Sequence, residues 1–235
     1  MTEKTKATFL RQSGWLALAT TIGGATSYAV HFFAKDLPKD EYGVFTTLLQ
    51  ILNMVAIPAI GLQTVFAQQA AAAKTDADEK QLTVAAHAIL RMLIGLWLVG
   101  VFAVFIGQRQ IAAAIKIDDP SALWLTIISG LFALGLPMAY GLLQGRQNFF
   151  WYGWAAMMLG VARLVAVAAL LMTVAKIATN AMVGVLLGYI VAFAIAWRAR
   201  ELHPADPDIS FDWRDWLRRV IPISIGAGAF LSLIH

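Results

Sequence analysis

The sequence contains no cysteine and few charged residues. Of its 235 residues, 14% are Asp, Glu, Lys or Arg, against roughly 25% in a typical soluble domain. Without cysteine, the chain cannot form a disulfide or use a thiolate as a metal ligand or nucleophile. Its histidines, which lack a metal-binding spacing such as HExxH, are His31, His87, His203 and His235. We therefore expect neither a metal centre nor any other cofactor.

Acidic residues are absent from the long apolar stretches of the chain. All 14 of them lie in the polar connections or near the N-terminus. The net charge is +4, but no basic patch with interleaved aromatic residues occurs outside the apolar stretches. Such a patch is typical of nucleic-acid binding, so the sequence does not predict a nucleic-acid partner.

Apolar residues dominate the composition instead. They make up 60% of the chain, and the mean hydropathy is +0.70. A soluble domain is about 45–50% apolar, and one buried core could not take up this excess. The natural surroundings of the chain are therefore a lipid bilayer.

Six apolar segments and the beginning of a seventh are each expected to form a membrane-spanning helix, because lipid offers no hydrogen-bond partners to an exposed backbone. They cover about 14–34, 43–70, 84–106, 122–145, 149–174 and 178–197, followed by 217 onward. The predicted fold is an all-α polytopic membrane protein with a six-helix lobe over 1–200. A loop over 201–216 and the start of a seventh helix over 217–235 would follow.

The connections between these segments make two further predictions. They are short, so sequential helices are expected to be antiparallel neighbours. The last segment stops without a polar exit, so we expect the chain to be the N-terminal half of a longer protein.

Lysine and arginine are unevenly divided between the two sets of connections. One side would hold Lys4, Lys6, Arg11, Lys74, Lys80, Arg146, Arg198, Arg200, Arg214, Arg218 and Arg219, and the other Lys35, Lys39, Arg109, Lys116 and Lys176. Cytoplasmic connections carry the excess of positive charge. The N-terminus is therefore expected in the cytoplasm.

Four short stretches carry a resemblance to a known family. They are "LPKDEYGVF" from Leu37, "GLQTVFAQQAA" from Gly61, "GLLQGRQNFFWYG" from Gly141 and "LRRVIPISIGA" from Leu217. In this order, with the long loop after the sixth helix, the chain resembles the Wzx-type flippases of polysaccharide and lipid-linked oligosaccharide precursors. These form a branch of the MOP (multidrug/oligosaccharidyl-lipid/polysaccharide) exporter superfamily, which also contains the MATE-like transporters.

The resemblance implies a non-enzymatic transporter in the cytoplasmic (inner) membrane. Two six-helix lobes related by a pseudo-twofold axis would work by alternating access, and this chain would supply the first. The implied partners are a polyprenyl-diphosphate-linked glycan as substrate, membrane lipid, the missing C-terminal lobe and the polysaccharide polymerase machinery of the cell envelope.

Polar residues recur at spacings of three and four in several segments. The second segment has Gln50, Asn53, Gly61, Thr64 and Gln68, the first has Thr20, Gly24, Ser27 and His31, and the fourth has Thr126, Ser129, Tyr140 and Gln144. Each set falls on one helix face. Such faces could line a water-filled cavity that binds a glycan, for which we select Gln50, Asn53, Thr64, Gln68 and Tyr140. Alternatively, they are the small and polar residues that hold membrane helices together, as the GxxxG of Gly184 and Gly188 is expected to do.

Arg163 is the most informative single residue. It lies in an apolar segment with no other charge from Phe149 to Ala175. An arginine at mid-membrane depth costs about 2.5–3.5 kcal/mol on insertion scales. With no acidic partner in any span, it could bind the diphosphate of a lipid-linked substrate through its guanidinium fork. It could also pair with a group in the missing lobe.

Arg91 and His87 lie one turn apart in the third segment. They could form a cationic mouth that receives a phosphate head group from the inner leaflet. The alternative is that both are interfacial residues whose polar ends reach the head-group region.

Three other functions remain open. A cation-coupled multidrug exporter of the same superfamily typically uses a membrane-embedded carboxylate, which these segments lack but the missing lobe could hold. A membrane glycosyltransferase or ligase could use Asp36, Asp40 and Glu41, but the hairpin that holds them is short for a substrate cleft. A non-transporting scaffold of the cell envelope would be distinguished by a transport assay.

Overall fold

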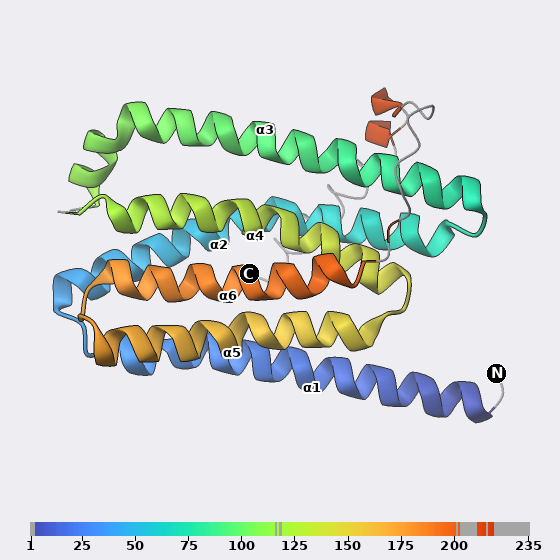
Figure 1. The fold of residues 1–235 in the computed structure, drawn as a ribbon, viewed down its shortest axis with the longest axis horizontal. Coiled ribbons are helices and arrows are strands. Elements are labelled where there is room, and N and C mark those ends of the chain that lie inside the picture. Colours follow the sequence, from blue (N-terminus) through green and yellow to red (C-terminus); the bar gives the residue numbers. More distant parts are fainter. Residues whose placement is uncertain are drawn as a thin grey trace.

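The computed structural model describes residues 3–115, 117, 119–200, 202, 211–214 and 216–218. Within these residues the chain forms six α-helices and no strand (Figure 1), which confirms the predicted all-α fold. The helices are α1 (Glu3–Ala34), α2 (Lys39–Ala72), α3 (Asp76–Ala114), α4 (Ser121–Gly145), α5 (Phe149–Thr173) and α6 (Ala178–Arg198). Most of the predicted loop 201–216 and almost all of the predicted seventh helix, 217–235, lie outside the described residues.

The six helices run side by side along the length of the molecule (Figure 1). The N-terminus, the α2–α3 and α4–α5 turns and the end of α6 lie together at what we call the N-terminal end. The α1–α2, α3–α4 and α5–α6 connections lie at the opposite end, the hairpin end. The two sets of connections that the sequence assigned to opposite sides of the membrane are therefore at opposite ends of the bundle.

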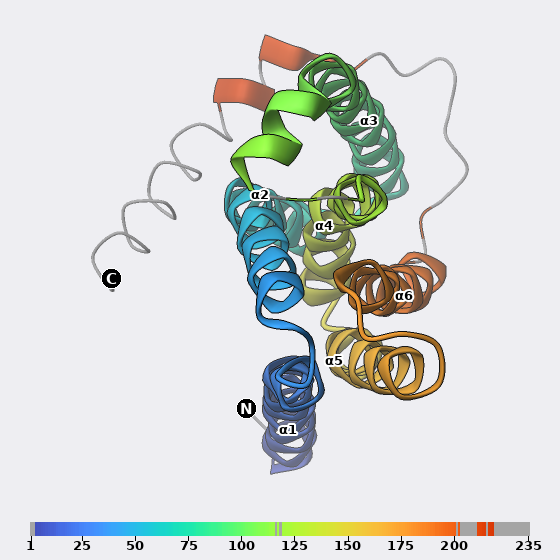
Figure 2. The same ribbon diagram turned by 90° about the vertical axis from the view of Figure 1, so that its left-hand side faces the viewer.

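The helices do not pack in the order of the sequence. α1 packs mainly against α5, α2 against α4, α5 against α6 and α6 against α4, while α3 lies along α4 (Figure 2). The expectation that sequential helices are neighbours is right for α5 with α6 and for α3 with α4, and wrong for α1 with α2. A short connection brings only one end of two helices together, and the faces along their length decide what they pack against.

Glycine faces explain two of these pairings. A Cβ on Gly160 of α5 would lie 2.1 Å from the carbonyl oxygen of Gly23 in α1. A Cβ on Gly141 of α4 would lie 2.4 Å from the carbonyl oxygen of Gln63 in α2. Neither site has room for a side chain, so the two backbones touch, as small residues allow in membrane bundles.

Among the described residues, five helices, α2 to α6, are long and apolar enough to cross a membrane. The chain is thus a multi-pass membrane protein, with one span fewer by this measure than the six expected. α1 has the length but not the composition, since its middle contains the run "TTIGGATS". The hydroxyl groups of Thr20 and Thr26 donate hydrogen bonds to the carbonyl oxygens of Leu16 (2.8 Å) and Ile22 (2.7 Å). These polar groups are therefore satisfied within α1 itself.

The charged α1–α2 hairpin contacts the start of α6 at the hairpin end. The backbone N–H of Ala178, in the first turn of α6, donates a 2.6 Å hydrogen bond to the Glu41 carboxylate. Ile177, which precedes α6, has no side chain that could accept this bond. Glu41 therefore caps a helix that lies far from it in the sequence, and the carboxylate also opposes the positive end of the α6 dipole.

At the N-terminal end, α3 begins with a capping box. The Thr75 hydroxyl accepts from the N–H of Asp78 (3.2 Å), and the Asp78 carboxylate accepts from the N–H of Thr75 (3.0 Å). The hydrogen bond from the Thr75 hydroxyl is the main cause that lowers the pKa of Asp78. The cap fixes the first turn of α3, which carries Glu79.

Arg146 joins three segments at the same end. Its guanidinium forms an ion pair with Glu79 of α3 and donates to the carbonyl oxygen of Arg200, just beyond α6. Arg200 in turn stacks on the ring of Trp197, 3.3 Å from the centroid. The α4–α5 turn thereby holds the start of α3 and the exit of α6 in place.

Candidate substrate-binding site

Arg163 lies near the middle of α5 on the face that packs against α6. A Cβ on Gly188 of α6 would come within 2.8 Å of the Arg163 Cβ, so the glycine makes room for the arginine. The guanidinium carbon lies 5.2 Å from the centroid of the Tyr189 ring, within cation–π range. Arg163 is half-buried, and it has no ion pair with an acidic residue in the part of the chain that the structure describes.

The Arg163 side chain is left with unused hydrogen-bonding capacity. Its Nε is buried and has no hydrogen-bond partner among the described residues. The guanidinium lies over the face of the Tyr189 ring, which does not accept a hydrogen bond from Nε in its own plane. A buried donor without a partner is costly, so Nε retains the capacity for one more hydrogen bond.

Tyr140 of α4 belongs to a second group of polar side chains, which comes from α2, α4 and α5. Its ring packs against that of Tyr152, with centroids 4.8 Å apart, and its hydroxyl is buried without a hydrogen-bond partner in the described part of the chain. The amide nitrogen of Gln63 in α2 donates to the Tyr152 hydroxyl and to the Gln144 side chain, each at 3.1 Å. Three helices, α2, α4 and α5, thus meet through polar side chains.

The two groups are neighbours. Tyr189 and Arg163 meet at the contact of α6 with α5, and α6 also packs against α4, which carries Tyr140. We call the combined set, Gln63, Tyr140, Gln144, Tyr152, Arg163 and Tyr189, the inner polar cluster. It offers one cation, amide groups and phenol groups, and contains no carboxylate.

The inner polar cluster includes residues that the sequence reasoning did not select as site residues. Gln63 and Gln144 pair across the α2–α4 contact, and Tyr152 and Tyr189 reach their partners from α5 and α6. A glutamine in an apolar helix must find a partner, which was the available signal for Gln63. No sequence signal identified Tyr189, because its role depends on which helix packs against Arg163.

The selected residues of α2 lie on the surface of the lobe instead. Gln50, Asn53 and Gln68 are exposed, and Thr64 is half-buried with its hydroxyl directed to the carbonyl oxygen of Ile60 (3.4 Å). They alternate along α2 with exposed apolar residues such as Met54 and Ile57. The structure does not bring them into the inner polar cluster.

Arg91 and His87 are also separate from Arg163. They lie on α3, which packs along α4, whereas Arg163 is on α5 between α1 and α6 (Figure 2). Arg91 is exposed, and the Nδ1 of the half-buried His87 lies 2.9 Å from the carbonyl oxygen of Thr83 in its own helix.

Acidic residues are confined to the helix ends, as the sequence predicts. Those within the described helices are in the first turns, at Glu3, Asp40, Glu41, Asp76, Asp78 and Glu79. In the described part of the chain, no three His, Asp or Glu residues are grouped closely enough to hold a metal ion. The ligand chemistry of the inner polar cluster is therefore that of hydrogen bonds and one guanidinium.

Comparison with known proteins identifies the fold. No family model matches the sequence, and no curated protein does. Among solved structures, a MATE protein in complex with Br-NRF matches with a TM-score of 0.74 and 15% identity, over 93% of this chain and 53% of that one. A MOP superfamily transporter from Pyrococcus furiosus, described by the reverse polarity of its binding pocket, matches with a TM-score of 0.72 and 13% identity. That match covers 92% of this chain and 52% of the transporter.

A further MATE structure, in complex with MaD3S, matches with a TM-score of 0.62 and 15% identity, over 92% of this chain and 53% of that one. The chain thus spans about half the length of the transporters it resembles. At such low identity the likeness concerns the fold, and the fold is that of one half of a MATE-type transporter.

Proposed function

We propose that the chain is the first lobe of a MOP superfamily exporter that moves a lipid-linked oligosaccharide or polysaccharide precursor across the cytoplasmic membrane. A second lobe would complete the transport path, and rocking of the two lobes would expose the site to each side of the membrane in turn. The membrane helices and the fold of half a MATE-type transporter support the transport role.

The proposed substrate class depends on one observation, namely the surroundings and hydrogen bonding of Arg163. This guanidinium lies among apolar helices, over the ring of Tyr189, and its buried Nε has no hydrogen-bond partner within the residues that the structure describes. Binding to a diphosphate would satisfy it through charge-assisted, bidentate hydrogen bonds. The phenol and amide groups of the inner polar cluster could then bind the hydroxyl groups of the first sugar.

The exposed polar residues of α2 fit the same proposal. Gln50, Asn53, Thr64 and Gln68 would face a hydrated path between this lobe and the second one, along which a glycan could pass. Arg91 and His87 would act as an outlying cationic pair that attracts the phosphate head group before it reaches Arg163. The polymerase machinery would use the translocated product.

A multidrug exporter is the second candidate, because MATE structures with the same fold hold Br-NRF and MaD3S. Export of cationic drugs would require a carboxylate near the site, and the inner polar cluster offers an arginine there. The Pyrococcus transporter, with its pocket of reverse polarity, indicates that this fold accepts sites of different charge.

Arg163→Ala in the full-length protein tests the proposal. We expect glycolipid transport into proteoliposomes to fall at least about tenfold, because a hydrogen bond to a charged group contributes roughly 1.5–3 kcal/mol. Arg163→Lys should restore part of the rate, since a lysine keeps the charge and loses the fork.

Arg109→Ala, an exposed arginine at the end of α3, is the matched control and should transport normally. Wild-type transport by Arg163→Ala would remove this residue from the site. Active export of cationic drugs with no glycolipid transport would favour the second candidate.

A further inference from the structure

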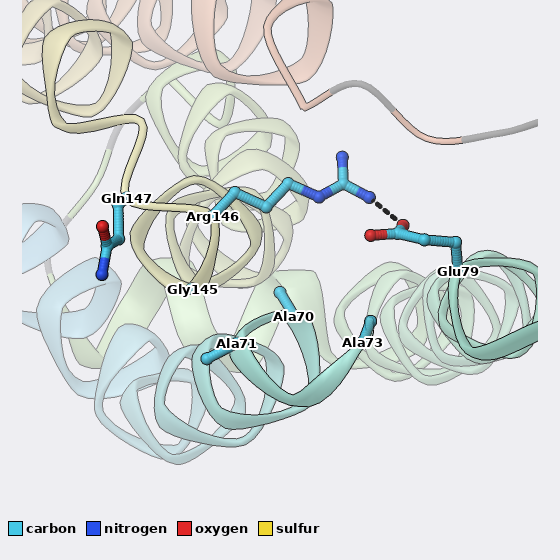
Figure 3. Close-up of a pocket in the computed structure, with 7 residues that line it drawn as sticks. All are labelled: Ala70, Ala71, Ala73, Glu79, Gly145, Arg146 and Gln147. Carbon is cyan, nitrogen blue, oxygen red and sulfur yellow. Dashed lines mark hydrogen bonds and ion pairs between the residues drawn. The ribbon is translucent and has the colours of Figure 1, made fainter. Parts of the chain in front are cut away.

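A pocket that the proposed site does not use lies at the N-terminal end of the bundle. It is formed by the last turn of α2, the first turn of α3 and the α4–α5 turn, and has a volume of about 510 Å³ (Figure 3). Ligand pockets typically measure about 300–1,000 Å³. We call it the end pocket.

Small side chains make the space. Ala70, Ala71 and Ala73 of the α2 end lie along one side of the end pocket, as Figure 3 shows. Their short side chains leave the opening free, and Ala71 is exposed to it. A larger residue at position 71 would occupy the pocket without disturbing a buried contact.

The polar walls of the end pocket define its ligand. Arg146 and Glu79 lie on one side as an ion pair, and the amide of Gln147 lies on the other (Figure 3). A charged ligand would have to break the ion pair, and burying an uncompensated charge is unfavourable. Hydroxyl groups could accept from the guanidinium, donate to the carboxylate and do both with the amide while the pair stays intact.

The backbone at Gln147 gives an independent indication. Gln147 has φ 58°, the one positive value among the non-glycine residues that the structure describes. It follows the end of α4, where glycine is the usual residue because it adopts this conformation without strain. A glutamine held there at a conformational cost, with its side chain lining the pocket, points to a task for the amide.

We propose that the end pocket binds a neutral, hydroxyl-rich ligand, namely a saccharide unit of the transported glycolipid. This subsite rests on the proposed function. It would bind the glycan outside the membrane interior, whereas Arg163 would bind the diphosphate within it. The two sites would therefore recognise different parts of one substrate.

The test compares two probes in detergent with the full-length protein: polyprenyl diphosphate carrying a neutral oligosaccharide long enough to reach from Arg163 to the end pocket, and the same polyprenyl diphosphate without sugar. We expect the wild-type protein to bind the glycosylated probe more tightly. Ala71→Leu should reduce that preference about tenfold, which corresponds to the loss of one or two hydrogen bonds, and leave the affinity for the bare probe within about twofold. Ala72→Leu is the matched control, since Ala72 is exposed in the same turn but does not line the pocket.

Gln147→Gly separates a binding role from a structural one. Glycine relieves the positive φ, so the melting temperature should rise, while the preference for the glycosylated probe should fall. A higher melting temperature with an unchanged preference would show that Gln147 has only a structural role.

The remaining outcomes separate the subsite from the proposed function. An unchanged preference in Ala71→Leu, or equal binding of both probes by the wild-type protein, would overturn the subsite, while transport dependent on Arg163 would leave the function intact. If the wild-type protein binds neither probe, the proposed function fails, and the subsite fails with it.

Discussion

Two tyrosines of the inner polar cluster differ in what their hydroxyl groups contact. The Tyr152 hydroxyl accepts a hydrogen bond from Gln63, whereas the buried Tyr140 hydroxyl has no hydrogen-bond partner among the residues described by the structure. An unpaired buried hydroxyl destabilises a protein, and natural structures contain few of them. A group kept in this state is a candidate for binding something that the folded chain itself does not supply.

Tyr140→Phe and Tyr152→Phe should therefore have opposite effects on stability. Tyr140→Phe removes the unpaired group and should raise the free energy of unfolding by up to about 1–3 kcal/mol, whereas Tyr152→Phe breaks a bond worth about 0.5–1.5 kcal/mol. Thermal denaturation in detergent compares the two variants. If Tyr140→Phe is more stable but transports less, its hydroxyl acts on the substrate; if it is less stable, the hydroxyl has a structural partner.

Single residues of the cluster were predictable to different degrees. Arg163 could be selected from the sequence, because a single charged residue in an apolar segment can be recognised without knowing how the helices pack. Gln63, Tyr152 and Tyr189 were not selected, because their roles follow from α2 meeting α4 and from α5 meeting α6. Gln50 and Asn53 share a helix face, as predicted, but that face points out of the lobe.

Among the helices, α6 depends on residues from other elements for its start. The Glu41 carboxylate accepts from the N–H of Ala178, and Asp119 in the α3–α4 connection accepts from the Thr179 hydroxyl (3.2 Å). The N–H and hydroxyl of Ser121 and then Thr179 lower the pKa of Asp119. The ionised Asp119 carboxylate therefore stabilises the folded chain. This stabilisation is fully present above the pKa that Asp119 has in the unfolded chain, and it is lost as the pH falls through the lower pKa of the folded chain.

Glu41→Ala should destabilise the protein by about 1–2 kcal/mol, because it leaves a helix N–H without its acceptor. Glu41→Gln keeps a neutral acceptor and should cost less. The melting temperature in detergent measures both, with Asp36→Ala, an exposed acid in the same hairpin, as control. Equal melting temperatures for Glu41→Ala and Asp36→Ala would mean that the cap contributes nothing measurable.

Helix positions were predictable from sequence, but helix contacts were not. The apolar stretch 84–106 lies within α3, which runs from Asp76 to Ala114, because helical hydrogen bonding continues beyond the apolar region once a cap such as Thr75 starts the helix. The pairing of α1 with α5 depends on the backbone contact at Gly160. Hydrophobic periodicity does not report such a contact, since glycine is common in membrane helices.

On the scale of the whole molecule, the two ends of the bundle differ in charge. The N-terminal end carries Arg11, Lys74, Lys80, Arg146, Arg198 and Arg200, and the hairpin end carries Lys35, Lys39, Arg109 and Lys176. Lysine and arginine are retained on the cytoplasmic side of a membrane. We therefore propose that the N-terminal end, with the end pocket, faces the cytoplasm, where a lipid-linked precursor would be loaded.

Cysteine labelling can test this orientation directly, because the chain has no cysteine of its own. In a full-length protein without other cysteines, Lys39→Cys would place a thiol at the hairpin end and Lys74→Cys at the N-terminal end, both at exposed positions. A membrane-impermeant maleimide added to spheroplasts should label Lys39→Cys at once and Lys74→Cys only after permeabilisation. Equal labelling of both after permeabilisation is the control for reactivity. The reverse pattern would place the end pocket outside the cell, and a cytoplasmic precursor could then not reach it before transport.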